Sequence, residues 1–262
     1  MNSKLKIYQV DAFASHVFEG NPAAVIPLEN WLSDEMMQKI AQENNLSETA
    51  FFIPTEKRYH IRWFTPLAEV KLCGHATLAS AHVLFNHLNF DKNEIHFDSQ
   101  SGILKVKRKE NLIILDFPAS QLSEVEIPGN LKNAFQHQPV KCLKGCDDLM
   151  LVFEHESEIL ELKPDFQRII ESKTRGIIVT APSKEFDFVS RFFAPAVGVN
   201  EDPVTGSAHT MLIPYWSNKQ GKNELTAKQI SKRGGILYCR NMGDRVEIGG
   251  EAVTYITGDI VI

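Results

Sequence analysis

Glycine and polar residues gather at the starts of two apolar segments. The first group is Gly74 and His75, and the second is Asp202, Thr205, Gly206, Ser207 and His209. A carboxylate, an imidazole and hydroxyl groups can accept, donate and move protons. A structural loop does not need so many polar groups beside a buried helix, so this composition favours a binding or catalytic site.

The two glycines, Gly74 and Gly206, each open a segment that is predicted to be helical. The first N–H groups of a helix have no partner inside it and carry partial positive charge, so they attract anions. A glycine also lets a ligand approach the backbone closely. Taken singly, each glycine is a common helix junction. With their polar neighbours, the two helix starts predict a site for a small carboxylic acid.

Glu48 is a single acid that directly precedes an apolar strand. A carboxylate with an ordinary pKa of about 4.3 is a weak base toward a C–H bond. Burial beside apolar groups such as Phe51 and Phe52 would raise that pKa toward neutrality, where the group can act as base and then as acid. Its position alone favours a solvated loop acid, so the catalytic role depends on the family resemblance given below.

Four cysteines in the chain do not make a disulfide scaffold. Cys142 and Cys146 have the spacing of metal ligands, with His137 and His155 nearby, but no second tight pair of ligands is evident. We therefore predict no metal and a reduced, cytoplasmic protein. The sequence also contains no phosphate loop and no dinucleotide fingerprint, so neither ATP nor NAD is implied.

The chain must position these groups with a few helices and many short strands. Helices are predicted over 33–44, with Ser33 as N-cap, and over 74–88, 164–171 and 206–217, where Pro214 is expected to kink or end the helix early. Strands are predicted over 6–13, 23–26, 49–53, 59–65, 94–98, 103–107, 112–117, 149–153, 176–180, 186–192, 225–231, 235–239, 245–249 and 253–262.

One block of sequence occurs twice, about half a chain length apart. Phe64-Thr65-Pro66 precedes the helix at Gly74, and Phe193-Ala194-Pro195 precedes the helix at Gly206; both helices are apolar on nearly every face. We interpret these as two copies of one strand–loop–buried-helix unit. The fold class is then α+β, with two pseudo-symmetric lobes over 1–118 and 119–262. If a two-fold relates the lobes, their helix starts face each other across a cleft.

The composition is that of an ordinary globular protein. Of the 262 residues, 43% are hydrophobic and 23% charged, which excludes disorder and collagen. The net charge is −5, so the chain lacks the excess of basic residues expected of a protein that binds nucleic acid or an anionic membrane. No apolar stretch is long enough to predict a membrane span, and no signal-peptide core follows the first six residues.

The sequence resembles the PhzF-like family of phenazine biosynthesis, within the diaminopimelate epimerase-like superfamily. The matching stretches run along the chain in family order and are least evident between 121 and 175. They are Val10–Phe13, Gly20–Val25, Leu46–Phe51, Arg62–Pro66, Glu69-Val70, Cys73–Leu78, Arg191–Pro195 and Glu201–His209.

The resemblance implies a fold of two similar lobes. Each is a mixed β-sheet wrapped around one central helix, with the active site between the lobes and the last strand, 253–262, able to return to the first. It also implies a cofactor-independent homodimer. The best-known member of the family isomerises a dihydro-hydroxyanthranilic acid by moving protons.

The resemblance also assigns roles to individual residues. Glu48 matches the general acid/base, and Gly74 and Gly206 match the glycines whose N–H groups face the substrate carboxylate. The polar residues that orient the substrate or support proton transfer correspond to His75, Asp202 and Ser207, while Asn21 and Thr205 complete the expected substrate-binding set.

Two other functions remain open. Related amino-acid epimerases use two facing cysteines; Cys73 matches the first, but Thr205 occupies the duplicated position and is a poorer base than a thiol. An epimerase or racemase would therefore need Glu48 and a different second base. The third possibility is a metabolite-binding protein that retains the cleft without turnover.

Overall fold

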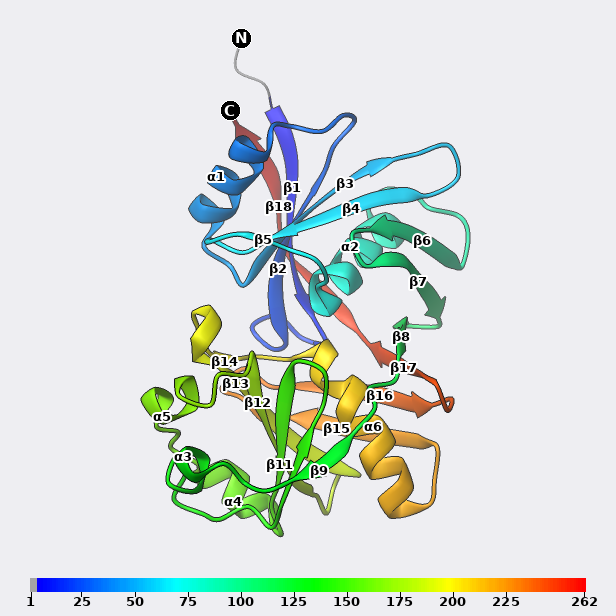
Figure 1. Cartoon of the computed structure of the whole chain (residues 1–262). Coiled ribbons are helices and arrows are strands. Elements are labelled where there is room, and N and C mark those ends of the chain that lie inside the picture. Colours follow the sequence, from blue (N-terminus) through cyan, green and yellow to red (C-terminus); the bar gives the residue numbers. More distant parts are fainter. Residues whose placement is uncertain (1–3) are drawn as a thin grey trace. The chain divides into compact units, whose positions relative to one another are not determined.

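The computed structural model describes residues 4–262, which form two compact units (Figure 1). Unit 1 comprises the chain up to Asp116 together with Gly249–Ile262, and unit 2 is Phe117–Ile248. The chain passes between the units within β8 (Leu112–Pro118) and within β17 (Arg245–Gly250). The first three residues, included in the search for an N-terminal signal, lie outside the described residues.

Unit 1 is built on a mixed sheet. Its strands pair in the order β18 (Ala252–Val261), β1 (Lys4–Ala12), β2 (Asn21–Pro27), β3 (Glu48–Pro54), β4 (Tyr59–Phe64), β6 (Glu94–Ser99), β7 (Gly102–Lys109) and β8. The pairs β2–β3 and β4–β6 are parallel and the others antiparallel. The short strand β5 (Glu69–Val70) pairs antiparallel with β4.

Unit 2 repeats this topology. Its strands pair in the order β9 (Ser123–Val125), β10 (Lys141–Lys144), β11 (Asp148–Val152), β12 (Gly176–Pro182), β13 (Phe188–Ala194), β15 (Glu224–Gln229) and β16 (Gly235–Asn241). β11 and β12 are parallel, as β2 and β3 are in unit 1, and a short strand, β14 (Val199–Asp202), pairs antiparallel with β13, as β5 does with β4. The duplication inferred from one sequence block therefore extends through the order and direction of the strands.

The strand that follows each repeat joins the other unit. β9 follows β8 and pairs antiparallel with β10 of unit 2. β18 follows β17 and pairs antiparallel with β1 along the full length of β1. The last strand therefore belongs to unit 1.

The helix before β3 and the helix after β5 form where the sequence predicts them. In α1 (Asp34–Asn44), the Ser33 hydroxyl accepts a hydrogen bond from the backbone N–H of Met36, and the helix ends at Asn45 in a left-handed conformation. α2 (Gly74–Asn86) is buried along its length and packs against β1, β2 and β3. An apolar helix of this kind needs a sheet wrapped around it.

The helix after β14 is longer than predicted. α6 (Gly206–Gln220) continues past Pro214, so the expectation that the helix ends early there is wrong. A proline cannot donate to the carbonyl four residues earlier, which here is that of Thr210. The backbone N–H of Ser120 donates to this carbonyl at 3.0 Å instead, so the acceptor is satisfied from outside the helix.

The remaining differences are short elements, among them the strands β5, β9, β10 and β14, which the sequence does not predict. The helix expected over 164–171 forms only as α5 (Phe166–Ile170), because Asp165 accepts from Gln167 and Arg168 as its N-cap. Three short helical segments are absent from the sequence prediction: α3 (Gly129–Lys132), α4 (Glu156–Glu161) and the 3₁₀ turn Pro195–Val197. No helix in the described part of the chain is long and apolar enough to cross a membrane.

Candidate active site

Three polar side chains meet at the start of α2 in unit 1. Glu48 opens β3, and its Oε2 lies 3.2 Å from Nε2 of His75, the second residue of α2. Asn21 opens β2, and its amide nitrogen lies 3.2 Å from the other ring nitrogen, Nδ1. The structure therefore brings together the predicted residues Glu48, His75 and Asn21, with Gly74 beside them in the same turn.

His75 is a neutral base in this arrangement. Burial lowers its pKa from 6.5 to about 3, because the interior penalises the charged imidazolium. Nδ1 lies between two donors, the Asn21 amide and the Cys73 thiol, whose sulfur is 3.5 Å away. A neutral ring that accepts at Nδ1 carries its proton on Nε2, which faces Glu48. The two close atoms are not yet aligned for a hydrogen bond.

Local backbone geometry fixes Asn21. Gly20, just before it, has a φ of +64°, and a side chain there would place a Cβ only 2.1 Å from the carbonyl oxygen of Ala12. Only glycine fits this close approach between the loop and β1. Asn21 is then paired with Ala12 across the β1–β2 ladder and is fully buried.

The apolar flank of Glu48 differs from the expected one. Successive residues of a strand point to opposite faces, so Phe51 lies on the face opposite Glu48. Phe51 packs instead in the hydrophobic cluster beneath α1, with Ile26, Met37 and Phe64. Phe52 shares the face of Glu48 and is also buried.

A second polar group surrounds the start of α6 in unit 2. The Thr205 hydroxyl donates to Oδ2 of Asp202 at 2.5 Å, and the Thr205 N–H donates to Oε1 of Gln229 at 2.9 Å. The Gln229 amide donates to the Asp202 carbonyl. Gln229 is fully buried on β15 and ties the loop to the sheet. Because the Thr205 hydroxyl already donates a hydrogen bond to Asp202, Thr205 fits the role of an orienting residue rather than that of a base.

Ser207 has a partner that the sequence analysis did not identify. Nη2 of Arg175 donates to Oγ of Ser207 at 3.1 Å, and Nε donates to Oδ1 of Asp148 at 2.9 Å. The sequence held a signal for this pair. Asp148 opens a strand that is otherwise wholly apolar, and a buried carboxylate requires a cation or hydrogen-bond donors.

The first turns of α2 and α6 are fixed in the same way. The Thr77 hydroxyl donates to the carbonyl of Cys73, and Nδ1–H of His209 donates to the carbonyl of Thr205 at 2.9 Å. Each donor is the fourth residue of its helix, and each acceptor is the N-cap residue. His209, predicted near the site, therefore holds the backbone of the helix start.

The remaining cysteines do not form the metal pair considered from their spacing. Cys142 is buried, with its pKa raised to about 11 by desolvation, whereas Cys146 is exposed. Within residues 4–262, the group of three close metal-ligating side chains is Glu48, Cys73 and His75, whose donor atoms lie within 4.8 Å of one another.

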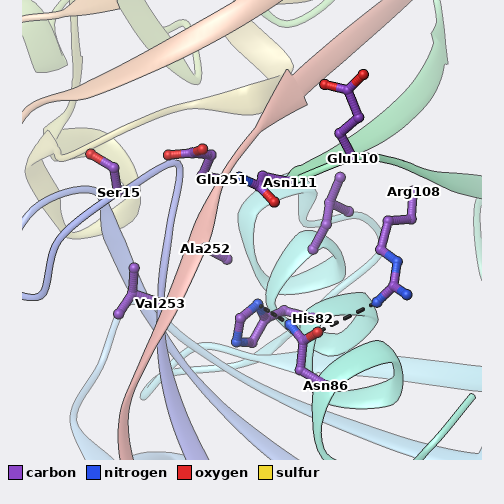
Figure 2. Close-up of a pocket in the computed structure, with 10 residues that line it drawn as sticks. Ser15, His82, Asn86, Arg108, Glu110, Asn111, Glu251, Ala252 and Val253 are labelled. Atoms are coloured by element: carbon purple, nitrogen blue, oxygen red, sulfur yellow. Dashed lines mark hydrogen bonds between the residues drawn. The ribbon is translucent and has the colours of Figure 1, made fainter.

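A separate hollow of about 480 Å³ lies beside the C-terminal half of α2 (Figure 2). Two hydrogen bonds link residues at its wall: Nη1 of Arg108 donates to Oδ1 of the Asn86 side chain, and the side-chain amide nitrogen of Asn86 donates to Nδ1 of His82. Burial, with a smaller effect from His87, lowers the pKa of His82 to about 4. None of the predicted site residues lines this hollow.

The chain is similar to known proteins over almost its whole length. A family model described as "Phenazine biosynthesis-like protein" matches residues 10–258. An uncharacterized isomerase of Pseudomonas aeruginosa is 51% identical over 257 residues, which is 98% of each chain. The crystal structure of a PhzF-family protein from Enterococcus faecalis is 44% identical, has a TM-score of 0.97 and covers 99% of this chain and 100% of its own.

More distant structures share the fold. A hydroxyproline epimerase from Agrobacterium vitis is only 9% identical, but its TM-score is 0.64 over 99% of this chain and 93% of its own. The α+β fold with a duplicated mixed sheet around a central helix, expected from the sequence, is thereby confirmed.

Proposed function

Because the chain belongs to the phenazine biosynthesis-like (PhzF) family, we propose that it is an isomerase that moves a proton on a small carboxylic acid, with Glu48 as general acid/base. The observation that carries the proposal is the contact between Oε2 of Glu48 and Nε2 of a buried, neutral His75. A neutral imidazole can orient a carboxylate without holding it in a permanent ion pair, so Glu48 stays able to accept a proton.

In this proposal Glu48 takes a proton from an activated carbon of the substrate and returns one at another position on the same face. His75, held by Asn21, keeps the Glu48 carboxylate in position. The N–H groups at Gly74 and Gly206 bind the substrate carboxylate, and Asp202, Thr205 and Ser207 orient the substrate. The reaction as proposed involves no cofactor, since one acid/base group can both remove and return the proton.

Exchange of carbon-bound hydrogen in deuterated water tests the assignment of Glu48. Dihydroaromatic acids and amino acids are incubated with the protein, and deuterium incorporation at carbon is followed by NMR. Glu48→Gln should lower the exchange rate by at least about 10²-fold, the scale of general acid–base catalysis. Glu124→Gln is the matched control, because Glu124 is an exposed acid on β9 that pairs with Lys141.

The alternatives predict different outcomes. An epimerase exchanges the proton and inverts the carbon, which chiral analysis of the product detects. A metabolite-binding protein binds an acid without any exchange. If the Glu48→Gln protein is folded and exchanges at the wild-type rate, Glu48 is not the base.

A further inference from the structure

Arg175 is held in place by groups that leave its guanidinium little freedom. It immediately precedes β12, and its fork pairs with both carboxylate oxygens of Asp148, of which only 4% is exposed. The guanidinium carbon lies 5.7 Å from the centre of the Phe192 ring. A Cβ at Gly176 would lie 2.3 Å from that ring, so the glycine next to Arg175 makes room for it.

The contact between Arg175 and Ser207 determines what the serine can do. A guanidinium has only donors, so Oγ of Ser207 must be the acceptor in this 3.1 Å hydrogen bond. A hydroxyl that accepts in this way keeps its own proton for a different partner. Arg175 thereby makes Ser207 a hydrogen-bond donor, and its positive charge strengthens that donor.

The duplication places Arg175 one residue before the position where unit 1 has its acid, because the strand registers make Gly176 the equivalent of Glu48. Asn21 opens β2 and Asp148 opens β11, while His75 and Ser207 are the second residues of α2 and α6. Glu48 opens β3, and the residue just before the equivalent strand is Arg175. In unit 1 the residue that opens β2 contacts the second residue of α2 directly. In unit 2 the residue that opens β11 contacts Arg175, which in turn donates to the second residue of α6.

We propose that Arg175 is a positioning residue that fixes the hydroxyl of Ser207 as a donor to the carboxylate of the substrate. Unit 1 then carries the proton-transfer group at the start of β3, and the residue just before the equivalent strand of unit 2 carries the cation that prepares recognition of the anion. This inference rests on the proposed function, because it needs a carboxylic acid as substrate.

A double-mutant cycle tests the coupling. Arg175→Lys keeps the positive charge beside Asp148 but removes the guanidinium that donates to both Asp148 and Ser207. It is measured alone and in combination with Ser207→Ala. With Ser207 present we expect KM for the exchanged acid to rise about tenfold, the effect of one charged hydrogen bond, with a smaller change in kcat. In the Ser207→Ala background the same substitution at Arg175 should change KM less than twofold. If Arg175→Lys does not fold, Arg175→Gln replaces it.

Arg168→Lys is the matched control, because Arg168 is also an arginine of unit 2 that pairs with an aspartate, Asp165, but does not contact Ser207. Its effect should be the same in both backgrounds. Equal effects of Arg175→Lys in the two backgrounds would show that Arg175 is only structural and overturn the inference.

The failure of the proposed function can be recognised separately. If Glu48→Gln leaves exchange intact, the acid/base assignment fails, and the same cycle is measured on the dissociation constant of benzoate by calorimetry, which needs no turnover. Coupling between Arg175 and Ser207 in benzoate affinity supports the inference, whereas additive effects or no binding of benzoate contradict it.

Discussion

At the scale of single residues, the protonation state of His75 decides how Glu48 can act. Its pKa of about 3 means that the ring stays neutral through the physiological range. We predict that the imidazole carbon resonances of His75 do not move between pH 8 and 6, a range that spans the ordinary pKa of about 6.5 while the protein stays folded. Two-dimensional NMR, with assignment by His75→Asn, checks this, and the protein unfolded in urea supplies the reference titration. A midpoint near the ordinary value of about 6.5 in the folded protein would contradict a buried neutral ring.

The donors around Glu48 also argue against a metal. Nδ1 of His75 is occupied by the Asn21 amide and the Cys73 thiol, and the ring proton lies on the side of Glu48. A metal ligand needs a free lone pair, which this tautomer does not offer toward the carboxylate. We expect dialysis against a chelator to leave the exchange rate unchanged within twofold. Loss of activity that Zn²⁺ restores would contradict the cofactor-independent proposal.

How much of the site is readable from sequence differs between its residues. Glu48, His75 and Asn21 lie in motifs that a family resemblance identifies, and the structure brings them together. Arg175 and Gln229 are far from those motifs in the chain and reach the helix start only through the sheet. Their contacts depend on strand order, which one sequence without a fold does not specify.

At the scale of elements, a matching ion pair ties each short strand to its neighbour. Arg62 on β4 donates two hydrogen bonds of 2.7 Å to the carboxylate of Glu69 on β5. Arg191 on β13 donates hydrogen bonds of 2.7 and 3.0 Å to the carboxylate of Glu201 on β14. The pair with Glu69, and a second bond to Asp34, raise the pKa of Arg62 despite burial. Each pair anchors the loop that leads to a helix start.

Replacing either arginine should therefore loosen a helix start. Lysine keeps the charge but cannot form a fork, so Arg62→Lys and Arg191→Lys should each lower the free energy of unfolding by about 2 kcal/mol. Urea denaturation measures this. Arg240→Lys, at an exposed pair with Glu224 of 3.9 Å, should change stability by less than about 0.5 kcal/mol. Similar small losses at all three positions would show that the forks are not structural anchors.

The elements themselves are largely predictable, and the failures have local causes. The two buried helices can be identified because apolar residues on every face of a helix indicate full burial. Pro214 misleads the prediction because the donor that replaces its missing N–H, Ser120, lies on a distant segment. The short helices of unit 2 escape prediction because one turn contains too few residues for a period to show.

At the scale of the whole molecule, three buried histidines make stability depend on pH. Burial lowers the pKa of His75 to about 3 and of His82 and His209 to about 4. These rings are neutral in the folded protein, whereas the unfolded chain binds protons below about pH 6.5. The stabilising effect of neutral burial is thus complete above about pH 6.5 and is lost progressively as pH falls toward the folded pKa values.

Each of these histidines should lower the free energy of unfolding by about 2 kcal/mol between pH 7 and pH 5, since the loss is roughly 1.4 kcal/mol per pH unit below 6.5. The total is comparable with the stability of an ordinary domain. Urea unfolding at pH 7 and pH 5 measures it, and a folded His209→Gln variant should lose about a third of the dependence. A stability that is flat from pH 7 to 5 would refute neutral burial of the rings as the cause.

β18, which follows unit 2 in the sequence but belongs to unit 1, makes the folding of unit 1 depend on residues far from the rest of that unit in the sequence. β18 pairs with β1 from Ala12 opposite Ala252 to Lys4 opposite Val261. Deleting 252–262 exposes an unpaired strand edge, so we expect loss of the cooperative unfolding transition and aggregation. Circular dichroism and light scattering check this, and a peptide of residues 249–262 added in trans should restore solubility. A soluble, cooperatively folded deletion variant would contradict this role.

The same pairing sets an order of events during synthesis. β1 is translated before unit 2, and its partner β18 is translated after unit 2, so unit 1 is started before unit 2 but can be completed only after it. At about 5–20 residues per second, the edge of β1 waits for between roughly ten and fifty seconds. During that interval unit 2 already has its own β9 beside β10. A nascent chain of this topology therefore depends on whatever shields the edge of β1 until β18 has been translated.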